Sequence, residues 1–472
     1  MGFDTYLLGG VNIGLRYAGR YLRGLPTGVF PGGYELSYPK STVALIIINV
    51  AVYAVTSIRN MFMSISDYWV ELGSYIPILM VEDSSNIYRV FTSMFLHGDI
   101  LHIFFNMYFL YIFGKSVENS LGSLRFLVLY FISGILATVF HTAFSYIQGA
   151  YALMIPAIGA SGAISGVLAA YLMFYPGTSL SACWFFFIFP VCFTVRASYW
   201  LLFWFATQVI YGYSRLGAAV AFFAHAGGFV AGIALLPLVV RRERLELLRA
   251  WRSYGHILNV IFRDTEFVRG LGRLTKVALS ILIASLIAGS AVITSNVNYL
   301  SIYVADVSGR AANITELDDS VMFALVNDNV EVQTITNTYT RVLINRLVGL
   351  DVLINRSASS SSLNIVGLNT TSKLRVGNTI VDVPVYVESL RLTYGVDGVL
   401  KEAYGSFRTV IVSIGTNTYR FGESITYDFN IKVVEHYDAS RMILSTGLVS
   451  LTVSAIALMV TLFRDKELTI VG

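Results

Sequence analysis

Long apolar runs separated by short polar segments dominate the first 295 residues of the chain. Most of these runs approach the length that a helix needs to cross the hydrocarbon core of a membrane, which is about 30 Å thick. The shorter runs suit helices that neighbouring helices shelter from lipid. The pattern predicts eight spans, at residues 41–58, 101–114, 126–146, 159–175, 197–213, 222–240, 277–295 and 442–463.

The pattern changes after residue 295, where the long apolar runs stop. Apolar and polar residues alternate along Thr379–Val387, Thr409–Ser413 and Tyr427–Val433, and Gly and Asn punctuate the segment. A period of two is typical of β-strands with one buried face. Residues 296–441 are therefore predicted to form a β-rich domain between the seventh and eighth spans.

The composition favours a membrane protein over a soluble one. Only 13% of the 472 residues are charged and 55% are hydrophobic, whereas soluble proteins are about 25% charged. The net charge of +4 is too small and too scattered for a nucleic-acid-binding protein. The two cysteines, Cys183 and Cys192, lie in one apolar stretch and support neither a disulfide framework nor a thiolate metal site.

The distribution of Lys and Arg predicts how the chain is oriented. Basic residues outnumber acidic ones in residues 1–40 and 241–276, whereas acidic residues dominate 59–100. Cytoplasmic loops carry the excess of Lys and Arg, so both basic segments are expected in the cytoplasm. We therefore predict a multi-pass protein with both termini cytoplasmic and residues 296–441 extracytoplasmic. Because residues 296–441 contain no cysteine, we predict that the membrane is the plasma membrane of a prokaryote.

Uncharged polar residues begin three of the predicted spans. His102 and Asn106 lie four residues apart on one face of the second, Ser161 opens the fourth, and His225 lies in the first turn of the sixth. These spans run in the same direction, so the four side chains share one depth in the membrane. A hydroxyl, an imidazole and two further hydrogen-bond donors are the components of an acyl-transfer site.

Each of these groups also has a purely structural interpretation. A serine among glycines commonly packs helices, and Gly162/Gly166 and Gly228/Gly232 form G-x-x-x-G pairs that would let the fourth and sixth helices approach closely. A membrane histidine can bond to a neighbouring carbonyl instead of catalysing. A metal site is a further alternative, but no carboxylate or cysteine accompanies the histidines at ligand spacing, and we predict none.

In their order along the chain, these residues resemble the motifs of the rhomboid family of intramembrane serine proteases. The matches are Tyr88-Arg89, His97-x4-His102-x3-Asn106, Glu118 with Leu121-Gly122, Gly159-x-Ser161-Gly162 and Ala224-His225-x2-Gly228-x3-Gly232. They fall within residues 40–240. The resemblance implies a six-helix bundle with a Ser–His dyad in a water-filled cavity, and it implies no cofactor.

The resemblance also implies roles for individual residues. Ser161 would attack the scissile carbonyl and His225 would take its proton, while His102, Asn106 and the backbone amide of Ser161 would bind the oxyanion. Structural support would come from His97, Arg89, Glu118, Gly159, Gly162, Gly228 and Gly232. One departure concerns Ser165, because some relatives have an aromatic residue there that stacks on the histidine; something else must then hold His225.

The expected fold is an α-helical polytopic membrane protein in which two additional transmembrane helices flank an extracytoplasmic β-rich domain. The expected segments are a cytoplasmic N-terminus (1–40), the six-helix core (41–240), a basic linker (241–276), the seventh helix (277–295), the β-rich domain (296–441), the eighth helix (442–463) and a cytoplasmic tail (464–472).

The expected function is hydrolysis of peptide bonds in or next to the transmembrane segments of membrane-protein substrates. The expected partners are those substrates and the lipid bilayer, with possible envelope or substrate contacts through residues 296–441, and no nucleic acid. Two alternatives remain open. One is a catalytically silent rhomboid-like protein that binds membrane clients, and the other is an envelope-binding module that the helices anchor.

Overall fold

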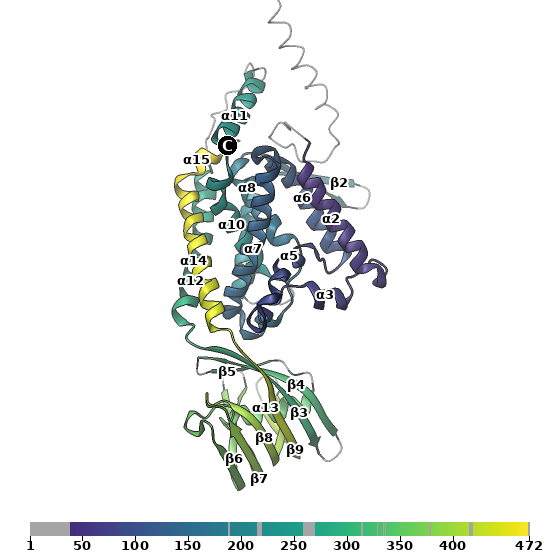
Figure 1. Cartoon of the computed structure of the whole chain (residues 1–472), viewed down its shortest axis with the longest axis vertical. Coiled ribbons are helices and arrows are strands. Elements are labelled where there is room, and N and C mark those ends of the chain that lie inside the picture. Colours follow the sequence, from purple (N-terminus) through teal and green to yellow (C-terminus); the bar gives the residue numbers. More distant parts are fainter. Residues whose placement is uncertain are drawn as a thin grey trace, which may run out of the picture.

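The structure is a computed structural model that describes residues 38–186, 189–214, 220–257, 270–312, 315–327, 329–333, 335, 337–376, 379–414 and 419–470. These residues form a helical bundle and, at one end of it, a β-sheet domain (Figure 1). Nearly all of the predicted N-terminal segment 1–40, the middle of the predicted linker 241–276 and the last two residues of the tail lie outside the described ranges.

Helix α8 (Ser161–Phe174) lies at the centre of the bundle, and every residue after Ser161 in it is buried. A helix that is apolar on all sides is expected to be enclosed by others. Helices α6, α7 and α10 pack directly against α8, α2 packs on α6, and α9 packs on α10. Their bounds are α2 (Lys40–Ser57), α6 (Ile100–Leu121), α7 (Ser123–Gln148), α9 (Ala197–Ser214) and α10 (Phe222–Val239).

Short helical turns fill the segment between α2 and α6. They are η1 (Ile58–Asn60), α3 (Asp67–Gly73), α4 (Leu79–Glu82), η2 (Ser84–Tyr88), α5 (Arg89–Thr92) and η3 (Ser93–Phe95). The buried guanidinium of Arg89 donates to the carbonyls of Glu71, at 2.6 Å, and Ser74, at 3.2 Å. It also donates to the side-chain oxygen of Asn86 at 2.9 Å. Arg89 thus joins η2 and α5 to the end of α3.

Glu118 joins α6 to the beginning of α2. Its buried carboxylate accepts hydrogen bonds from the backbone amides of Ser41, at 2.9 Å, and Thr42, at 2.8 Å. It also accepts hydrogen bonds from the hydroxyls of Thr42 and Ser123. A carboxylate at a helix N-terminus accepts hydrogen bonds from the free amides and interacts favourably with the positive end of the helix dipole.

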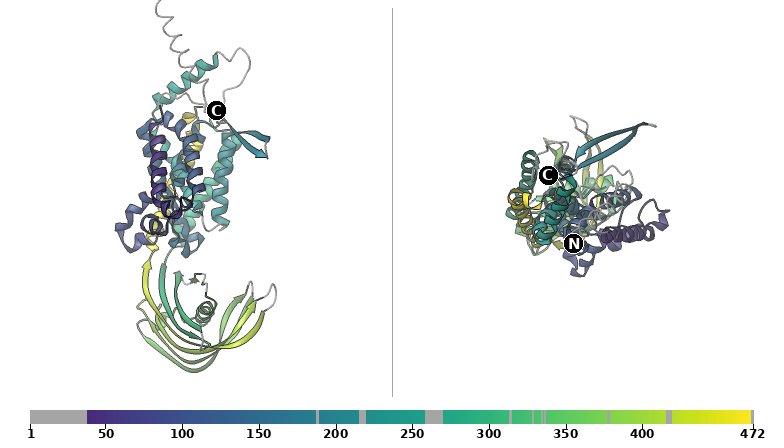
Figure 2. Two further views of the ribbon diagram at one scale, coloured as in Figure 1. Left: turned by 90° about the vertical axis from the view of Figure 1, so that its right-hand side faces the viewer. Right: turned by 90° about the horizontal axis from the view of Figure 1, so that it is seen from above.

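Four further elements follow or connect helices of the bundle. Helix η4 (Ala150–Met154) follows α7, strands β1 (Ser179–Phe186) and β2 (Phe189–Arg196) form an antiparallel hairpin between α8 and α9, and α11 (Arg242–Ile257) follows α10. The hairpin projects away from the bundle (Figure 2).

Two long helices lie along one side of the bundle. Helix α12 (Arg273–Asn296) packs against α14 (Ser440–Phe463), and α14 packs against α7 and α10 (Figure 1). The short helix α15 (Asp465–Leu468) follows α14 and returns the chain to the end of α8. The chain between α12 and α14 forms the β-sheet domain.

The domain is a seven-stranded sheet of antiparallel pairs in the order β5-β4-β3-β9-β8-β7-β6. Helix α13 (Thr338–Gly349) lies inside the curve of the sheet (Figure 2). The strands are β3 (Leu300–Ala311), β4 (Thr315–Val326), β5 (Asn329–Val332), β6 (Ser362–Val376), β7 (Thr379–Tyr394), β8 (Leu400–Ile414) and β9 (Tyr419–Asp438), and η5 (Arg356–Ala358) precedes β6. The prediction of a β-rich domain is confirmed.

The sheet domain contacts the end of the bundle at which α8 begins. Glu331 of β5 accepts a hydrogen bond from the backbone amide of Ala150, at 3.0 Å, in the chain between α7 and α8. Tyr146, near the end of α7, donates from its hydroxyl at 3.3 Å to the carbonyl of Asn296, the last residue of α12, from which the chain enters the sheet domain. The domain is therefore on the same side of the bundle as Ser161.

Six helices in the described ranges are long and apolar enough to cross a membrane: α2 with η1, α6, α7, α10, α12 and α14. They correspond to six of the eight predicted spans. The predicted span 159–175 is the apolar but shorter α8, of 14 residues. The predicted span 197–213 is α9, whose 18 residues include Gln208 and several Tyr and Trp side chains that lower its mean hydropathy.

Candidate active site

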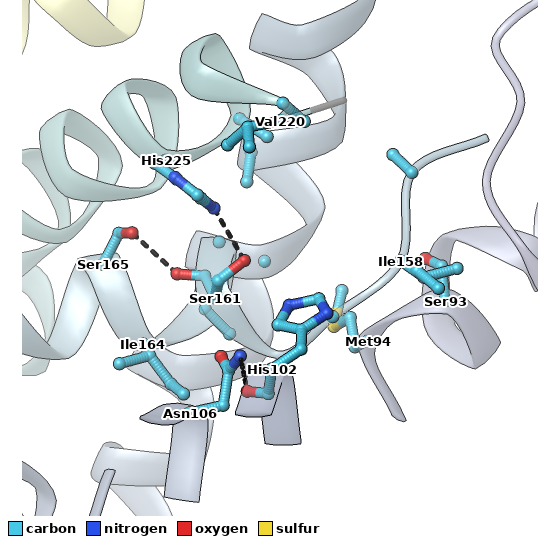
Figure 3. Close-up of a pocket in the computed structure, with 18 of the residues that line it drawn as sticks. Ser93, Met94, His102, Asn106, Ile158, Ser161, Ile164, Ser165, Val220 and His225 are labelled. Atoms are coloured by element: carbon cyan, nitrogen blue, oxygen red, sulfur yellow. Dashed lines mark hydrogen bonds between the residues drawn. The ribbon is translucent and has the colours of Figure 1, made fainter. Parts of the chain in front are cut away.

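Three helices begin at the same end of the bundle and bring their first turns together. Helix α6 begins at Ile100, α8 at Ser161 and α10 at Phe222. His102, Ser161 and His225 therefore lie at one depth, and all three line a cavity of about 510 Å³ (Figure 3). The order of the elements along the chain thus assembles residues that are far apart in sequence.

Ser161 and His225 are directly hydrogen-bonded. The distance from His225 Nε2 to Ser161 Oγ is 2.8 Å, and both side chains are half-buried (Figure 3). A hydroxyl hydrogen-bonded to an imidazole nitrogen is the arrangement that activates a serine nucleophile. The hydroxyl of Ser165, one turn along α8, instead donates to the carbonyl of Ser161 at 2.6 Å and is engaged within its own helix.

Glycines allow the backbones of α8 and α10 to touch. A Cβ atom placed on Gly228 would overlap the carbonyl oxygen of Gly162, and one on Gly232 would lie 2.5 Å from the carbonyl oxygen of Gly166. A carbon atom does not fit at either position, so residues larger than glycine would push the two helices apart. This close approach, which small residues permit in membrane helices, brings His225 within bonding distance of Ser161.

His102 faces Ser161 across a space that Gly159 leaves open. His102 Nδ1 accepts the backbone N–H of Gly98 at 3.3 Å, so a neutral ring carries its proton on Nε2. Gly159 has a φ of +125°, a conformation that favours glycine, and a Cβ there would lie 2.9 Å from His102 Nε2 and 3.5 Å from Ser161 Oγ. A small group between Ser161 and His102 could therefore accept the Nε2 proton.

Asn106 lines the same cavity from the next turn of α6 (Figure 3). Its Nδ2 donates to the carbonyl of His102 at 2.8 Å. An amide nitrogen carries two hydrogens, so this bond uses one and leaves the second for a group in the cavity.

His97 packs beside His102 and is fully buried. The planes of the two rings are inclined by 67°, with centroids 5.2 Å apart, and His97 Nδ1 lies 3.3 Å from the carbonyl of Phe95. Burial, with a smaller contribution from the charge of His102, lowers the pKa of His97 to about 3. His97 is therefore a neutral packing partner of His102 at physiological pH.

Two residues of α9 that the sequence did not identify also contact His225. The side-chain oxygen of Gln208 lies 2.8 Å from His225 Nδ1, and the rings of Trp204 and His225 have centroids 6.2 Å apart. A sequence signal for Gln208 existed, because an amide within an apolar span is costly unless it is hydrogen-bonded. No motif distinguished it from other polar residues of the spans.

Hydroxyl, imidazole and amide groups lie around Ser161 in the cavity, and the carboxylate of Asp99, which also lines it, accepts the backbone amides of Leu101 and His102. Ser161, His225, His102 and Asn106 supply one hydroxyl, two imidazoles and one amide, which are suited to acyl transfer. In the part of the chain that the structure describes, no three His, Cys, Asp or Glu side chains are grouped so that they could hold a metal ion.

Comparison with known proteins finds a family model that matches the region containing these residues. The family model of the Rhomboid domain matches residues 84–242. The chain is 27% identical to "Rhomboid-like protease 3" of Toxoplasma gondii over 219 residues, which are 46% of this chain and 74% of that protein. It is 30% identical to "Rhomboid protein 1, mitochondrial" of Saccharomyces cerevisiae, over 34% of this chain and 43% of that protein.

A third relative has a name that bears on activity. Over 90 residues the chain is 33% identical to "Inactive RHOMBOID-like protein 8" of Arabidopsis thaliana, covering 19% of this chain and 24% of that protein. The matched regions of the yeast and plant relatives are thus less than half of those proteins. The relatives include both a named protease and a named inactive protein.

The comparisons contradict one sequence-based prediction. We predicted a plasma membrane, but the yeast relative and several other matched relatives are named as mitochondrial proteins. The prediction of a plasma membrane rested on the scarcity of cysteines in the predicted extracytoplasmic domain, which does not identify the membrane that holds the chain. It was therefore wrong to name a compartment from cysteine usage.

Proposed function

We propose that this protein is an intramembrane serine endopeptidase, because the family model of the Rhomboid domain matches residues 84–242. It hydrolyses peptide bonds in or next to the transmembrane segments of membrane-protein substrates, the class of substrate on which the rhomboid family acts. The observation that carries the proposal is the 2.8 Å hydrogen bond between Ser161 Oγ and His225 Nε2 inside a cavity of an apolar bundle.

In the proposed reaction, Ser161 Oγ attacks the carbonyl carbon of the scissile bond while its proton passes to His225 Nε2. The tetrahedral intermediate then collapses to an ester on Ser161, and the C–N bond breaks as Nε2 returns the proton to the leaving amine. Water attacks the ester through the same two proton transfers and releases the second product. In each half of the reaction the same imidazole acts first as the base and then as the acid.

The oxyanion of the tetrahedral intermediate would be bound in the space beside Gly159. His102 Nε2–H faces this space, as the contacts of Gly159 indicate. The backbone amide of Ser161 lies at the start of α8, where no side chain caps the helix, so it can donate as well. The second Nδ2 hydrogen of Asn106 completes the proposed set of donors.

The proposed architecture has a catalytic core of six helices, α2 and α6 to α10, over residues 41–240. Helices α12 and α14 are proposed as two further spans that flank the sheet domain. Under this proposal the short α8 crosses only part of the membrane, because the cavity occupies the remaining depth. The contact of residues 296–441 with a substrate or an envelope component stays a prediction.

A catalytically silent, client-binding protein is the second candidate. The relative named as inactive favours it. The hydrogen-bonded pair of Ser161 and His225 favours activity instead, since a protein that only binds clients has no need of an aligned nucleophile and base. The two candidates differ in one measurable property, which is cleavage.

The test is cleavage of a transmembrane substrate by the purified full-length chain in proteoliposomes. We expect Ser161→Ala and His225→Ala each to lower the rate by about 10⁴-fold or more, because each removes half of the dyad. Ser165→Ala is the matched control and should keep activity, since its hydroxyl bonds only within α8. Equal cleavage by Ser161→Ala and the wild type would overturn the proposal.

The names of the relatives support a mitochondrial membrane as the compartment. Fractionation of cells that express the tagged chain tests this assignment. We expect the protein to sediment with a mitochondrial membrane marker, and recovery with a plasma-membrane marker would contradict the assignment.

A further inference from the structure

The nitrogen of His225 that faces away from Ser161 has its own partner. His225 Nδ1 lies 2.8 Å from Oε1 of Gln208, which is buried on α9. His225 therefore bridges two helices, because its other nitrogen bonds to Ser161 on α8. The bond to Gln208 matters for chemistry because a neutral imidazole has one protonated nitrogen and one basic nitrogen.

The hydrogen bonds of Gln208 fix which end of its amide faces His225. Its Nε2 donates to the hydroxyl oxygen of Thr207, at 3.1 Å, and to the carbonyl of Trp204, at 3.4 Å. The Thr207 hydroxyl gives its own proton to the Trp204 carbonyl at 2.6 Å, so its oxygen is available as an acceptor. The reversed amide would set its oxygen against the Trp204 carbonyl, and two acceptors repel each other.

The amide oxygen of Gln208 therefore faces His225 Nδ1 and requires a proton there. A neutral ring with its proton on Nδ1 has its lone pair on Nε2, directed at Ser161 Oγ. This is the tautomer that can accept the serine proton. The opposite tautomer would direct an N–H at the hydroxyl and could not act as the base.

We propose that Gln208 is a positioning residue that selects the reactive tautomer of His225, which makes the site a Ser161–His225–Gln208 triad. This inference rests on the proposed function. When Ser161 Oγ bonds to the substrate carbonyl, its proton moves to Nε2 and the ring becomes an imidazolium. The Nδ1–H continues to donate to Gln208, whose neutral oxygen stabilises the cation until Nε2 passes the proton to the leaving amine.

An amide suits this position better than a carboxylate. An isolated carboxylate in an apolar bundle is costly unless it is paired, and the imidazole that it would face is neutral for most of the cycle. Gln208 supplies the acceptor without a buried charge. Trp204, one turn before it on α9, adds an aromatic face beside His225, while the position one turn after the nucleophile is the small Ser165.

The experiment compares Gln208→Met with Gln208→Glu in the full-length chain. Methionine keeps the length of the side chain but has no strong acceptor, whereas glutamate keeps an acceptor oxygen. We expect Gln208→Met to lower kcat about 10- to 100-fold with little change in KM, as when a functional histidine loses its orienting partner. Gln208→Glu should retain more activity than Gln208→Met. Thr207→Val, which loosens the amide, should give a smaller loss in kcat.

A spectroscopic measurement tests the tautomer without relying on cleavage. The chain has six histidines, so 15N-histidine labelling gives few signals, and His225→Ala assigns the relevant one. We expect His225 to carry its proton on Nδ1 in the wild type and to exchange between tautomers in Gln208→Met. The thermal unfolding midpoint of each variant shows whether it is folded.

The two proposals fail in different ways. If Ser161→Ala is inactive but Gln208→Met matches the wild type in kcat and in the 15N signal of His225, the role of Gln208 is overturned and the protease remains. If Ser161→Ala still cleaves, the proposed function is overturned, and the 15N spectra alone decide the tautomer. A wild-type signal from a ring protonated on Nε2 overturns the role of Gln208 in either case.

Discussion

The two ends of α8 differ in whether other parts of the chain cap them. At the end that begins with Ser161, no side chain caps the helix, and the first turn opens on the cavity. At the other end, the hydroxyl of Thr469 donates to the carbonyl of Met173 at 3.1 Å, and the amide of Ile470 donates to the carbonyl of Phe174 at 2.7 Å. Residues 469 and 470, the last that the structure describes, thus cap the helix that begins with Ser161.

This difference indicates how a short helix can be both reactive and fixed. The first amides of a helix have no partner within the helix, and neither have its last carbonyls. The cavity end keeps its donors available for a developing negative charge, whereas the opposite end has its acceptors occupied by the chain that follows α14. The contacts of Thr469 and Ile470 with α8 add a structural role to the segment predicted only as a tail, 464–472.

The largest effect is expected at the contact between α8 and α10. Gly228→Ala places a methyl group against the carbonyl oxygen of Gly162, so α10 must move away and His225 must leave Ser161. We expect cleavage to be lost and the free energy of unfolding to fall by about 1–3 kcal/mol, as in overpacked cores. Cleavage rate and thermal unfolding measure the two effects.

Gly272→Ala is the control for this substitution. Gly272 precedes α12, and a Cβ there would have Thr275 Oγ1 as its nearest neighbour at 3.9 Å, which is an ordinary contact. The control should behave like the wild type. Full activity of Gly228→Ala would contradict the view that backbone contact between the two helices sets the dyad.

A smaller effect is expected at the opposite end of α8, where Asp465 anchors the tail. Its buried carboxylate pairs with Lys276 of α12 at 2.9 Å and accepts the amide of Leu271 at 3.1 Å. Asp465→Ala leaves both donors without this partner, so we expect the free energy of unfolding to fall by about 2 kcal/mol. Cleavage should fall as well, because the cap on α8 loosens.

Glu467→Gln is the matched control in the same short helix. The carboxylate of Glu467 is half-exposed and pairs with Arg464 and Arg242. Exposed ion pairs contribute little to stability, at most about 1 kcal/mol. A loss from Glu467→Gln as large as that from Asp465→Ala would contradict a specific role of the buried anchor.

The smallest effect is expected where the sheet domain touches the chain between α7 and α8. Glu331→Ala removes the acceptor of the Ala150 amide, and a single hydrogen bond contributes about 1 kcal/mol. We expect faster hydrogen exchange at residues 149–154 and an unchanged unfolding midpoint. Glu331→Gln keeps an acceptor oxygen and should exchange like the wild type; equal exchange in all three proteins would show that this contact does not order the segment.

The sequence was most informative about features that a regular spacing of residue types marks along the chain. Ser161 and His225 could be paired in advance because both open apolar runs that cross in the same direction, and glycines one turn apart accompany each of them. The alternation along Thr379–Val387 likewise predicted strands, because its period differs from that of a helix. These features depend on local spacing, which a sequence displays directly.

Contacts without a pattern could not be predicted. Gln208 lies in the middle of α9, and its hydrogen bond to His225 depends on how α9 packs against α10. The cap of α8 by Thr469 joins residues that are 296 positions apart, and the strand order of the sheet places β3 beside β9. Such contacts are set by tertiary packing, for which one sequence contains no periodic signal.

The central claim is that Ser161 is the nucleophile, and covalent capture tests it most directly. A fluorophosphonate reacts with an activated serine hydroxyl, and mass spectrometry of the labelled chain identifies the modified residue. We predict a single adduct on Ser161 that is absent from His225→Ala, because the hydroxyl needs the imidazole to be activated. No adduct on the folded wild type, an adduct on another serine, or equal labelling of Ser161 in His225→Ala would contradict the account.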